Sequence, residues 1–369
     1  MNDELFYSIA LKETEGVGDI LYKILTANFT DASTIFNTSK GRLLKINGVG
    51  EKVANAILSK QSFSKAEKLI TQAEAQQASI IPIGSAFYPD RLQQLNDAPP
   101  LLYYKGDTEI LNAPRIISIV GTRNATRYGR DFLDHLFEGL TQLNVVVISG
   151  LAYGIDVYAH QLCLQYEIPT IGALAGGIDR IYPAEHISIA NDMCKHGGLL
   201  SENPFGNRPN APKFPARNRI IAGMADATIV VEASIKGGAM ITAELAHGYN
   251  KDVFALPGNF NQNYSKGTNF LLKTNKASLI TSVNDLMYLM NWDMNYHETA
   301  QKQLFETVEF TEDERLLVNL LTDHASLTVD ELVIKTQTKP NKLASTLLSL
   351  EFKGVVNALP GNAYVLSTN

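Results

Sequence analysis

The chain has 369 residues, more than one ordinary domain needs, and its 45% hydrophobic and 19% charged residues are usual for a globular protein with filled cores. Its only cysteines, Cys163 and Cys194, form no C-x-x-C pair, which argues against a disulfide framework or a zinc site. The acidic start lacks a signal region and no apolar run reaches the roughly 20 residues that span a bilayer, so we expect a cytoplasmic protein without membrane contact.

Residues 1–78 are predicted to form a helical domain, helix-hairpin-helix or SAM-like, with short glycine-containing breaks. In its clearest element, a Gly-Val-Gly turn at residues 48–50 leads directly into a helix pattern. The amides of such a turn can bind a phosphate, and Lys52 would lie close by. A helical bundle that uses the glycines only as a compact connector explains the pattern equally well. A second Gly-Val-Gly, at residues 16–18, is flanked by acids that would repel phosphate and is expected to be a connector.

Residues 79–292 are predicted to be a Rossmann-like α/β domain, because strand-like and helix-like stretches alternate. The strand candidates carry continuous Val and Ile runs, which indicates strands buried on both faces and therefore a doubly wound parallel sheet. Residues 80–106 are expected to pack on the edge of this sheet. Strands are expected at residues 115–120, 145–149, 170–175, 227–232 and 253–256, and helices at residues 128–142, 155–166 and 239–249.

A small winged-helix-like domain is predicted at residues 308–369, after a polar linker at residues 291–307. Thr328 and Glu331 have the spacing of a capping box. From residue 293 onward the chain has 11 acids against 6 bases, which favours a protein-contact or packing role over DNA binding. Helices are expected at residues 311–322, 328–335 and 340–352, followed by a hairpin with strands at residues 355–356 and 364–366 and a turn at residues 360–362.

The positive charges are concentrated, although the formal charge of the whole chain is −6. Residues 110–130, 203–225 and 253–284 contain no Asp or Glu, while each stretch holds three or four Lys or Arg. In the middle stretch, Arg217 and Arg219 stand at the expected start of a helix. Arginine forks and helix N-termini both suit phosphate oxygens, so this distribution predicts a surface for a nucleic-acid backbone.

Glycine-containing loops follow several of the predicted strands. In an open parallel sheet, ligands bind outside the carboxyl ends of the strands, and glycines let the backbone approach a phosphate. We therefore predict that these loops contact a chain of phosphates. The loops contain Gly121, Thr122, Arg123 and Arg127 after the first strand, Gly150 and Gly154 after the second, and Lys236, Gly237 and Gly238 after a later one.

Signals for a cofactor or for catalysis are weak. There is no G-x-G-x-x-G, no Walker lysine motif and no ribose-binding acid after the second strand, so no nicotinamide or ATP cofactor is predicted. Asp156, His160 and His186 come without a nucleophile elbow or metal-ligand spacing. We expect Asp156 and His160 to bond to each other or to cap local backbone, and we predict that the protein is not an enzyme and holds no metal.

Six motifs follow one another through the middle domain: G-T-R…Y-G from residue 121, S-G-L-A-Y-G-I-D-V-Y-A-H from 149, G-G-I-D-R-I-Y-P from 176, F-P-A-R-N-R-I-I-A-G from 214, G-G-A-M-I-T-A-E from 237 and A-L-P-G…K-G-T-N-F-L-L from 255. In this order they resemble the bacterial DNA processing protein A family, also called DprA or Smf. The helix-hairpin-helix-like and winged-helix-like modules on either side fit variants of that family.

The resemblance implies a homodimer with an extended Rossmann-like core that binds single-stranded DNA, protects incoming strands during natural transformation and helps to load the RecA recombinase onto them. It implies that basic side chains of the first loop and of residues 213–219 contact phosphates, whereas Phe214 either stacks on a base or anchors the core. The residues expected to contact DNA are Gly121, Thr122, Arg123, Arg127, Gly150, Gly154, Lys213, Phe214, Arg217, Asn218, Arg219, Lys236, Gly237, Gly238, Lys266 and Lys52.

One loop departs from the family pattern, because G-G-A from residue 237 stands where many members have Ser-Gly-Ser, and hydroxyl donors are lost. An enzyme related to nucleotide phosphoribohydrolases, which carry P-G-G-x-G-T-x-x-E, is an alternative on the same scaffold. The glycine pair and Glu244 keep that spacing, but Met240 and Ile241 replace the Gly-Thr pair that closes its phosphate loop. A nucleotide-sensing regulator on the same scaffold is a further alternative.

Overall fold

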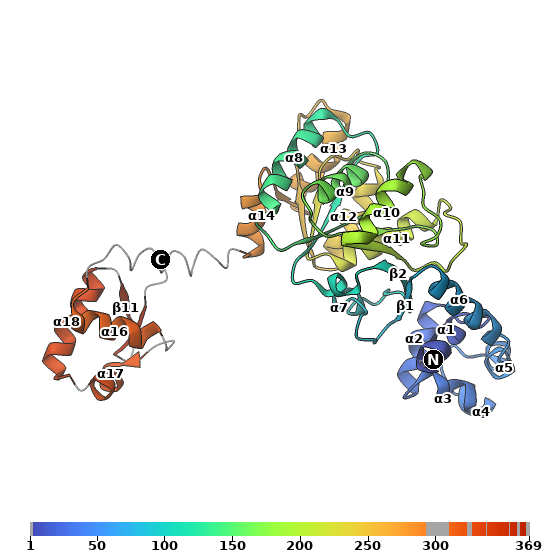
Figure 1. The fold of residues 1–369 in the computed structure, drawn as a ribbon, viewed down its shortest axis with the longest axis horizontal. Helices are drawn as coiled ribbons and strands as arrows, with labels where there is room; N and C mark the ends of the chain where they lie inside the picture. Colours follow the sequence, from blue (N-terminus) through green and yellow to red (C-terminus); the bar gives the residue numbers. More distant parts are fainter. Residues whose placement is uncertain are drawn as a thin grey trace. The chain divides into compact units, whose positions relative to one another are not determined.

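The computed structural model describes residues 3–292, 310–322, 327–336, 338–353, 355–359 and 362–366. It divides into two compact units, Met1–Leu286 and Met287–Asn369, and each is described by itself (Figure 1). Most of the predicted linker at residues 291–307 lies outside the described residues, as do two of the three residues of the predicted turn at 360–362.

Residues 3–75 are helical, as predicted, and the two Gly-Val-Gly segments form turns between helices. Gly16 and Gly48 have φ values of +82° and +87°, a left-handed conformation that glycine adopts without steric cost. A helix begins three residues after each of these two glycines. The helices are α1 Asp3–Lys12, α2 Asp19–Asn28, α3 Ala32–Asn37, α4 Lys40–Leu43, α5 Glu51–Ser59 and α6 Phe63–Ala75.

The centre of the first unit is a nine-stranded sheet with the order β1-β2-β6-β5-β4-β3-β7-β8-β9. From β6 to β9 all neighbours are parallel, which confirms the predicted doubly wound sheet. At one edge, β2 pairs antiparallel with β6 and β1 with β2, so residues 80–106 pack on the edge as expected. The strands are β1 Ser79–Pro82, β2 Leu101–Gly106, β3 Ile116–Val120, β4 Val146–Ser149, β5 Thr170–Ala173, β6 Gly197–Ser201, β7 Ala227–Val230, β8 Asp252–Ala255 and β9 Ser278–Leu279.

Helices flank the sheet in two groups. Contacts join α8 to α9 and α9 to α10, whereas α11 contacts α12 and α7. The predicted helices and strands are confirmed with end shifts of one or two residues. The helices are α7 Asp90–Gln93, α8 Arg127–Leu140, α9 Ile155–Gln165, α10 Ile187–His196, α11 Lys213–Met224, α12 Gly238–Gly248, α13 Lys266–Lys273 and α14 Val283–Met290, with short 3-10 turns η1 Thr108–Asn112, η2 Ala184–His186 and η3 Asn263–Ser265.

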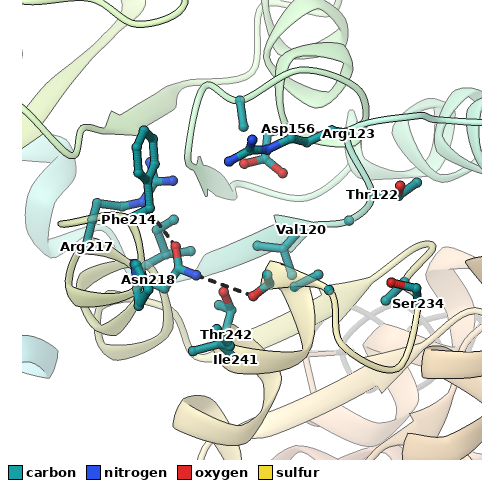
Figure 2. A pocket seen from close by; sticks show the side chains of 18 residues that line it. Val120, Thr122, Arg123, Asp156, Phe214, Arg217, Asn218, Ser234, Ile241 and Thr242 are labelled. Carbon is teal, nitrogen blue, oxygen red and sulfur yellow. Dashed lines mark hydrogen bonds between the residues drawn. The ribbon is translucent and has the colours of Figure 1, made fainter. Parts of the chain in front are cut away.

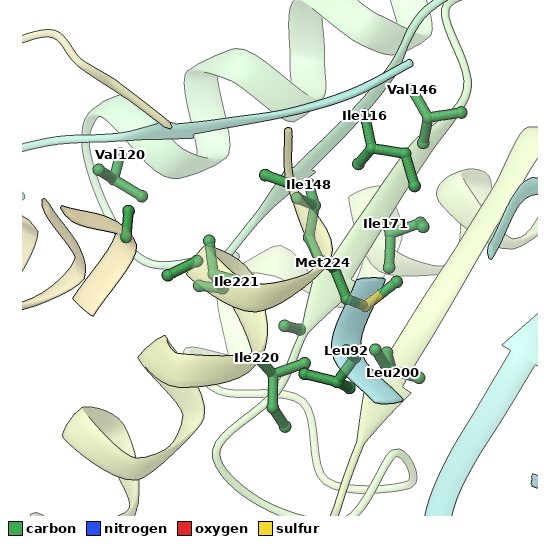
Figure 3. Packing of buried hydrophobic residues seen from close by; sticks show 14 of the residues in the cluster. Leu92, Ile116, Val120, Val146, Ile148, Ile171, Leu200, Ile220, Ile221 and Met224 are labelled. Atoms are coloured by element: carbon green, nitrogen blue, oxygen red, sulfur yellow. The ribbon is translucent and has the colours of Figure 1, made fainter. Parts of the chain in front are cut away.

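The C-terminal half of α11 is anchored in the main hydrophobic core. Ile220, Ile221 and Met224 are buried there together with strand residues such as Ile148 and Ile171 (Figure 3). Because successive strand residues point to opposite faces, alternate residues of these strands cover this helix and the others face the second layer. The anchored half fixes where the first turns of α11, residues 213–218, stand relative to the strand ends.

The helices of residues 3–75 share a second hydrophobic cluster with the sheet edge. Ile9 and Phe36 belong to the same buried cluster as Tyr103 of β2 and Leu199 of β6. The contact also involves backbone elements, since α1 and α6 both contact β1. The burial of apolar surface therefore joins the helical segment to the α/β core within the first unit.

Strand β6 was not predicted because it begins with two glycines, which have low strand propensity. Both are required by close packing. A Cβ on Gly197 would lie 2.0 Å from the carbonyl oxygen of Thr170, and a Cβ on Gly198 would lie 2.3 Å from the Tyr104 hydroxyl. Tyr104 is fully buried and crosses the strand at this point. The missing side chains make room for the backbone of β5 at Gly197 and for the β2 tyrosine at Gly198, which the sequence pattern does not reveal.

The second unit has the helices and hairpin expected of a winged helix. Its sheet has the order β10-β12-β11, and all pairs are antiparallel. The capping box is confirmed, because the Thr328 amide donates to Glu331 (2.8 Å) and the Glu331 amide donates to the Thr328 hydroxyl (3.3 Å). The elements are α16 Glu312–Thr322, β10 Leu327–Thr328, α17 Val329–Thr336, α18 Pro340–Phe352, β11 Val356–Leu359 and β12 Ala363–Leu366. None of the helices in the described part of the chain has the length and apolar character that a bilayer crossing requires.

Candidate nucleic-acid interface

A pocket of about 370 Å³ lies where the winding of the sheet reverses (Figure 2). From β3 the chain continues to β4, β5 and β6 on one side, and it then returns through α11 to β7 on the other side of β3. In open α/β sheets, such a reversal leaves a crevice at the carboxyl ends of the two central strands, where ligands bind. We call it the switch-point pocket. Its lining includes Gly121, Thr122, Arg123, Asp156, Phe214, Arg217, Asn218, Ser234, Gly237, Gly238, Ile241 and Thr242.

A carboxylate of the protein itself lies among the backbone amides of the predicted phosphate loops. Asp156 is 7% exposed, and interactions with the amides of Gly121, Gly150 and Ala152 oppose the rise in its pKa that burial causes. In addition, the Thr122 amide donates to the carbonyl of Glu232 (2.7 Å). The prediction that backbone amides of these loops contact phosphate is therefore corrected for Thr122, whose amide is already bound, and Asp156 would compete with phosphate for the other three.

Glycine is needed in these loops for packing. A Cβ on Gly121 would lie 2.4 Å from a side-chain carbon of Ile155. Gly154 has a φ of +79°, and a Cβ there would lie 2.3 Å from the carbonyl oxygen of Thr122. The two loops can approach each other only because both positions lack side chains.

Arg217 forms part of the pocket floor and is 5% exposed. Its guanidinium donates to the carbonyls of Gly150 (2.7 Å) and Ala173. Burial raises the pKa of Asp156, and the positive charge of Arg217 opposes that rise. Burial lowers the pKa of Arg217 to about 10, and Asp156 opposes that change, so the guanidinium stays charged at neutral pH. Arg217 thus joins the Gly150 loop to the end of β5 through its inward-facing donors, and its charge opposes the cost of burying Asp156.

Arg219 does not lie beside Arg217, although the basic side chains of residues 213–219 were all expected to contact the phosphates. Residues two apart on a helix point to nearly opposite sides. Arg219 instead donates to the Glu202 carboxylate and the carbonyl of Asp97, and it lies 3.9 Å from Asp19 of α2. It therefore connects α11 to the helical segment rather than to the switch-point pocket.

Replacing Arg219 with alanine is expected to lower the free energy of unfolding by about 1–3 kcal/mol, because Glu202 would lose its cation. Burial already raises the pKa of Glu202, and Arg219 opposes this rise. Affinity for single-stranded DNA should stay near that of the parent protein. Urea unfolding and a DNA titration would test both parts, with exposed Arg208 as the matched arginine control. A loss of DNA affinity without a loss of stability would show that Arg219 contacts DNA.

Arg123 and Phe214 come together at the rim of the switch-point pocket. Phe214 is half-buried, its ring lies edge-on to that of Tyr182 (5.8 Å between centroids), and the Arg123 guanidinium lies 5.7 Å from its centroid. The interpretation of Phe214 as a core anchor does not fit this position at a pocket wall. Lys213, next along α11, donates to Asn207 and to the carbonyl of Arg208 (3.1 Å).

Of the other predicted residues, some line the switch-point pocket and some do not. The side-chain amide of Asn218 donates to the carbonyl of Gly238 (3.4 Å) and so joins α11 to α12 in the pocket wall. Lys236, Lys266 and Lys52 are exposed but are not among the residues that line the switch-point pocket. Arg127 is also exposed, lies 3.5 Å from Asp131 and borders a different pocket.

Asp156 and His160 were expected to bond to each other or to cap local backbone, but His160 has a different partner. The buried His160 contacts the Thr170 hydroxyl (2.7 Å) rather than Asp156, and burial lowers its pKa to about 3. Ser234 and Thr242 in the pocket wall, and Tyr182 beside Phe214, were also missed. Their positions depend on how α12 and the loop after β5 approach α11, and only the packing of the helices decides this.

The family model for DNA recombination-mediator protein A matches residues 79–291, and the model for the DprA winged helix domain matches residues 301–362. The chain belongs to the DNA recombination-mediator protein A family. The family match covers every strand of the sheet and the entire switch-point pocket. The second match covers most of the predicted winged-helix domain.

Relatives from several bacteria are similar along much of the chain. DNA processing protein DprA of Bacillus subtilis is 39% identical over 61% of this chain and 76% of its own length, and protein Smf of Synechocystis is 29% identical over 98% of this chain and 99% of its own. The X-ray structure of DprA from Streptococcus pneumoniae superposes with a TM-score of 0.67 at 30% identity, over 77% of this chain and 97% of the other. A Helicobacter pylori structure, described by its single-stranded DNA binding mode, has a TM-score of 0.53 at 31% identity over 59% of this chain and 97% of the other.

Proposed function

We propose that this protein binds single-stranded DNA without sequence preference, protects incoming strands in natural transformation and helps to load the RecA recombinase onto them. It acts in the cytoplasm as a homodimer and is not an enzyme. Membership of the family supports the DNA-processing role, and the Helicobacter pylori relative, whose structure is described by its single-stranded DNA binding mode, supports the ligand.

The observation that carries the proposal is the pairing of Arg123 with the half-buried ring of Phe214 at the rim of the switch-point pocket. A cation next to an aromatic face is what a single strand requires, because the cation binds the phosphate and the ring stacks on the base. Base stacking is independent of sequence, since every base has a π-face. Lys213 extends the same rim and would contact the next phosphate.

The polar groups of the pocket favour binding over catalysis. The buried His160 contacts Thr170 and is not among the residues that line the pocket, whereas Asp156 lines it next to the positive charge of Arg217. The phosphoribohydrolase alternative also lacks support, because the apolar side chain of Ile241 lines the pocket in place of its phosphate-loop threonine. Release of free base from nucleoside monophosphates would contradict the proposal.

Salt dependence tests the proposed function directly. Affinity for a fluorescent oligothymidylate, measured by anisotropy at several salt concentrations, should fall linearly on a log–log plot and exceed affinity for duplex DNA. Replacing Arg123 with alanine should reduce that slope by about one ion, because one phosphate contact is lost. Lys195, exposed and paired with Asp192 on α10, provides a control alanine variant with an unchanged slope. Equal slopes for the two variants would show that Arg123 makes no phosphate contact. Saturable binding of a mononucleotide that is unaffected by added oligonucleotide would instead favour a nucleotide sensor.

A further inference from the structure

A second pocket, of about 900 Å³, lies between the start of α8 and the loop that leads into α13. Three aromatic side chains line it: Tyr128, Phe260 and Tyr264. Phe260 is 79% exposed and Tyr128 is 49% exposed, so both present apolar rings to solvent. We call this the aromatic pocket. Its volume is within the roughly 300–1,000 Å³ of small-molecule sites, and the proposed function does not yet use it.

Two loops run from the switch-point pocket to the aromatic pocket. In the loop after β3, residues 121–123 line the switch-point pocket and residues 126–128 line the aromatic pocket. In the loop after β7, Ala233 lines the switch-point pocket and Glu232, one residue earlier, lines the aromatic pocket. The Asn124 side chain donates to the Tyr264 hydroxyl (2.9 Å) and ties the first of these loops to the aromatic pocket. The two pockets are therefore neighbours on one surface.

The aromatic pocket is braced by hydrogen bonds. The Tyr128 hydroxyl donates to the carbonyl of Pro257 (2.6 Å), which fixes its ring. The Asn269 side chain accepts from the amide of Gly258 (3.1 Å) and donates to the carbonyl of the same residue (2.8 Å). Bracing before a ligand arrives reduces the entropy cost of binding.

The charges around the aromatic pocket suit a polyanion. Arg127 is 93% exposed, with Asp131 3.5 Å away on the solvent side of α8, and exposed Lys266 follows the pocket at the start of α13. The acid in the lining, Glu232, is buried, and its two oxygens accept from the Thr126 amide (2.9 Å) and the Thr126 hydroxyl (2.7 Å). The rim thus presents cations while the carboxylate is turned inward. Cations beside exposed rings are the recognition elements for single-stranded nucleic acid.

We propose that the aromatic pocket is a second subsite for the same DNA strand. A strand seated at Phe214 continues along the loop of residues 121–128, and a later base stacks on Phe260 while Arg127 binds the phosphate between them. This inference rests on the proposed function, because it assigns the next segment of the same ligand. It predicts that affinity rises with strand length until both pockets are filled.

The test compares oligothymidylates of about 4 and about 16 nucleotides, the range of site sizes known for single-strand binders. Replacing Phe260 with alanine should weaken binding of the longer strand roughly 5- to 150-fold and leave the shorter one unchanged, because only the longer one reaches the second ring. Phe87, 54% exposed and part of neither pocket, provides the control alanine variant. A second measurement uses the double variant Phe260→Trp with Trp292→Phe, whose tryptophan fluorescence should be quenched by the longer strand only.

Each outcome has a distinct meaning. Unchanged affinity of the Phe260→Ala variant for the longer strand, or an equal loss for both lengths, would overturn the second subsite. A change of oligomeric state with unchanged DNA affinity, seen by light scattering, would also overturn it and would assign the surface to contact between copies of this chain. Failure of the parent protein to bind either strand would instead contradict the proposed function.

Discussion

Replacing Arg217 with methionine is expected to lower the free energy of unfolding by about 2–6 kcal/mol, because two buried backbone carbonyls would each lose a donor at a cost of about 1–3 kcal/mol. The guanidinium is buried and donates to two backbone carbonyls, of Gly150 and Ala173. Without the guanidinium, both carbonyls lose a hydrogen-bond donor, and the buried Asp156 carboxylate loses a nearby positive charge. Urea unfolding followed by circular dichroism measures the difference. Arg208→Met, at an exposed position on the same segment, should stay within about 0.5 kcal/mol of the parent.

The stability lost in the Arg217→Met variant should depend on pH, and the ionisation of Asp156 sets the direction of that dependence. Burial raises its folded-state pKa above the unfolded value of about 3.9, and loss of Arg217 would raise it further. A carboxyl with a raised folded-state pKa destabilises the fold increasingly as the pH rises from the unfolded to the folded pKa. The stability difference between Arg217→Met and the parent should therefore narrow as the pH falls from 7.

Two results would separate a structural role for Arg217 from a direct contact with DNA. Adding Asp156→Asn to Arg217→Met removes the uncompensated carboxylate, so the double variant should regain part of the lost stability at pH 7. A single variant as stable as the parent but unable to bind DNA would show that Arg217 contacts phosphate directly.

Replacing Phe214 with alanine is expected to weaken binding of single-stranded DNA by about 1–3 kcal/mol, which is the loss of one stacked base. The ring is half-buried at the pocket wall beside Arg123 and Tyr182, so its removal leaves the buried core of α11 in place. Phe214→Tyr retains a π-face and should keep most of the affinity. Fluorescence anisotropy with a short oligothymidylate measures both variants.

The salt dependence of the Phe214 variant provides an internal check. Stacking releases no counterions, so the slope of log affinity against log salt should match that of the parent, in contrast to Arg123→Ala. A full loss of affinity together with a large loss of stability would mean that Phe214 supports the fold. Unchanged affinity in a stable variant would show that no base stacks at this ring.

Much of the fold could be predicted because its signals are local. Continuous Val and Ile runs mark the buried strands β3, β4 and β7, and a helix was expected where α11 begins. Strand β6 was missed, since its two glycines are required by close packing against Thr170 and Tyr104 on the two strands that flank it. The location of the site was predictable for a general reason, because the carboxyl ends of parallel strands meet at one edge of the sheet.

The roles of the individual site residues could not be predicted in the same way. The order of residues alone shows that a basic, acid-free segment enters a helix next to glycine loops of a parallel sheet. The packing of distant elements turns Arg217 inward to the Gly150 loop and Arg219 to the helical segment. It also leaves Arg123 and Phe214 together at the pocket rim. Spacing along a helix shows that two side chains diverge, but which of them meets the core depends on how distant elements pack around it.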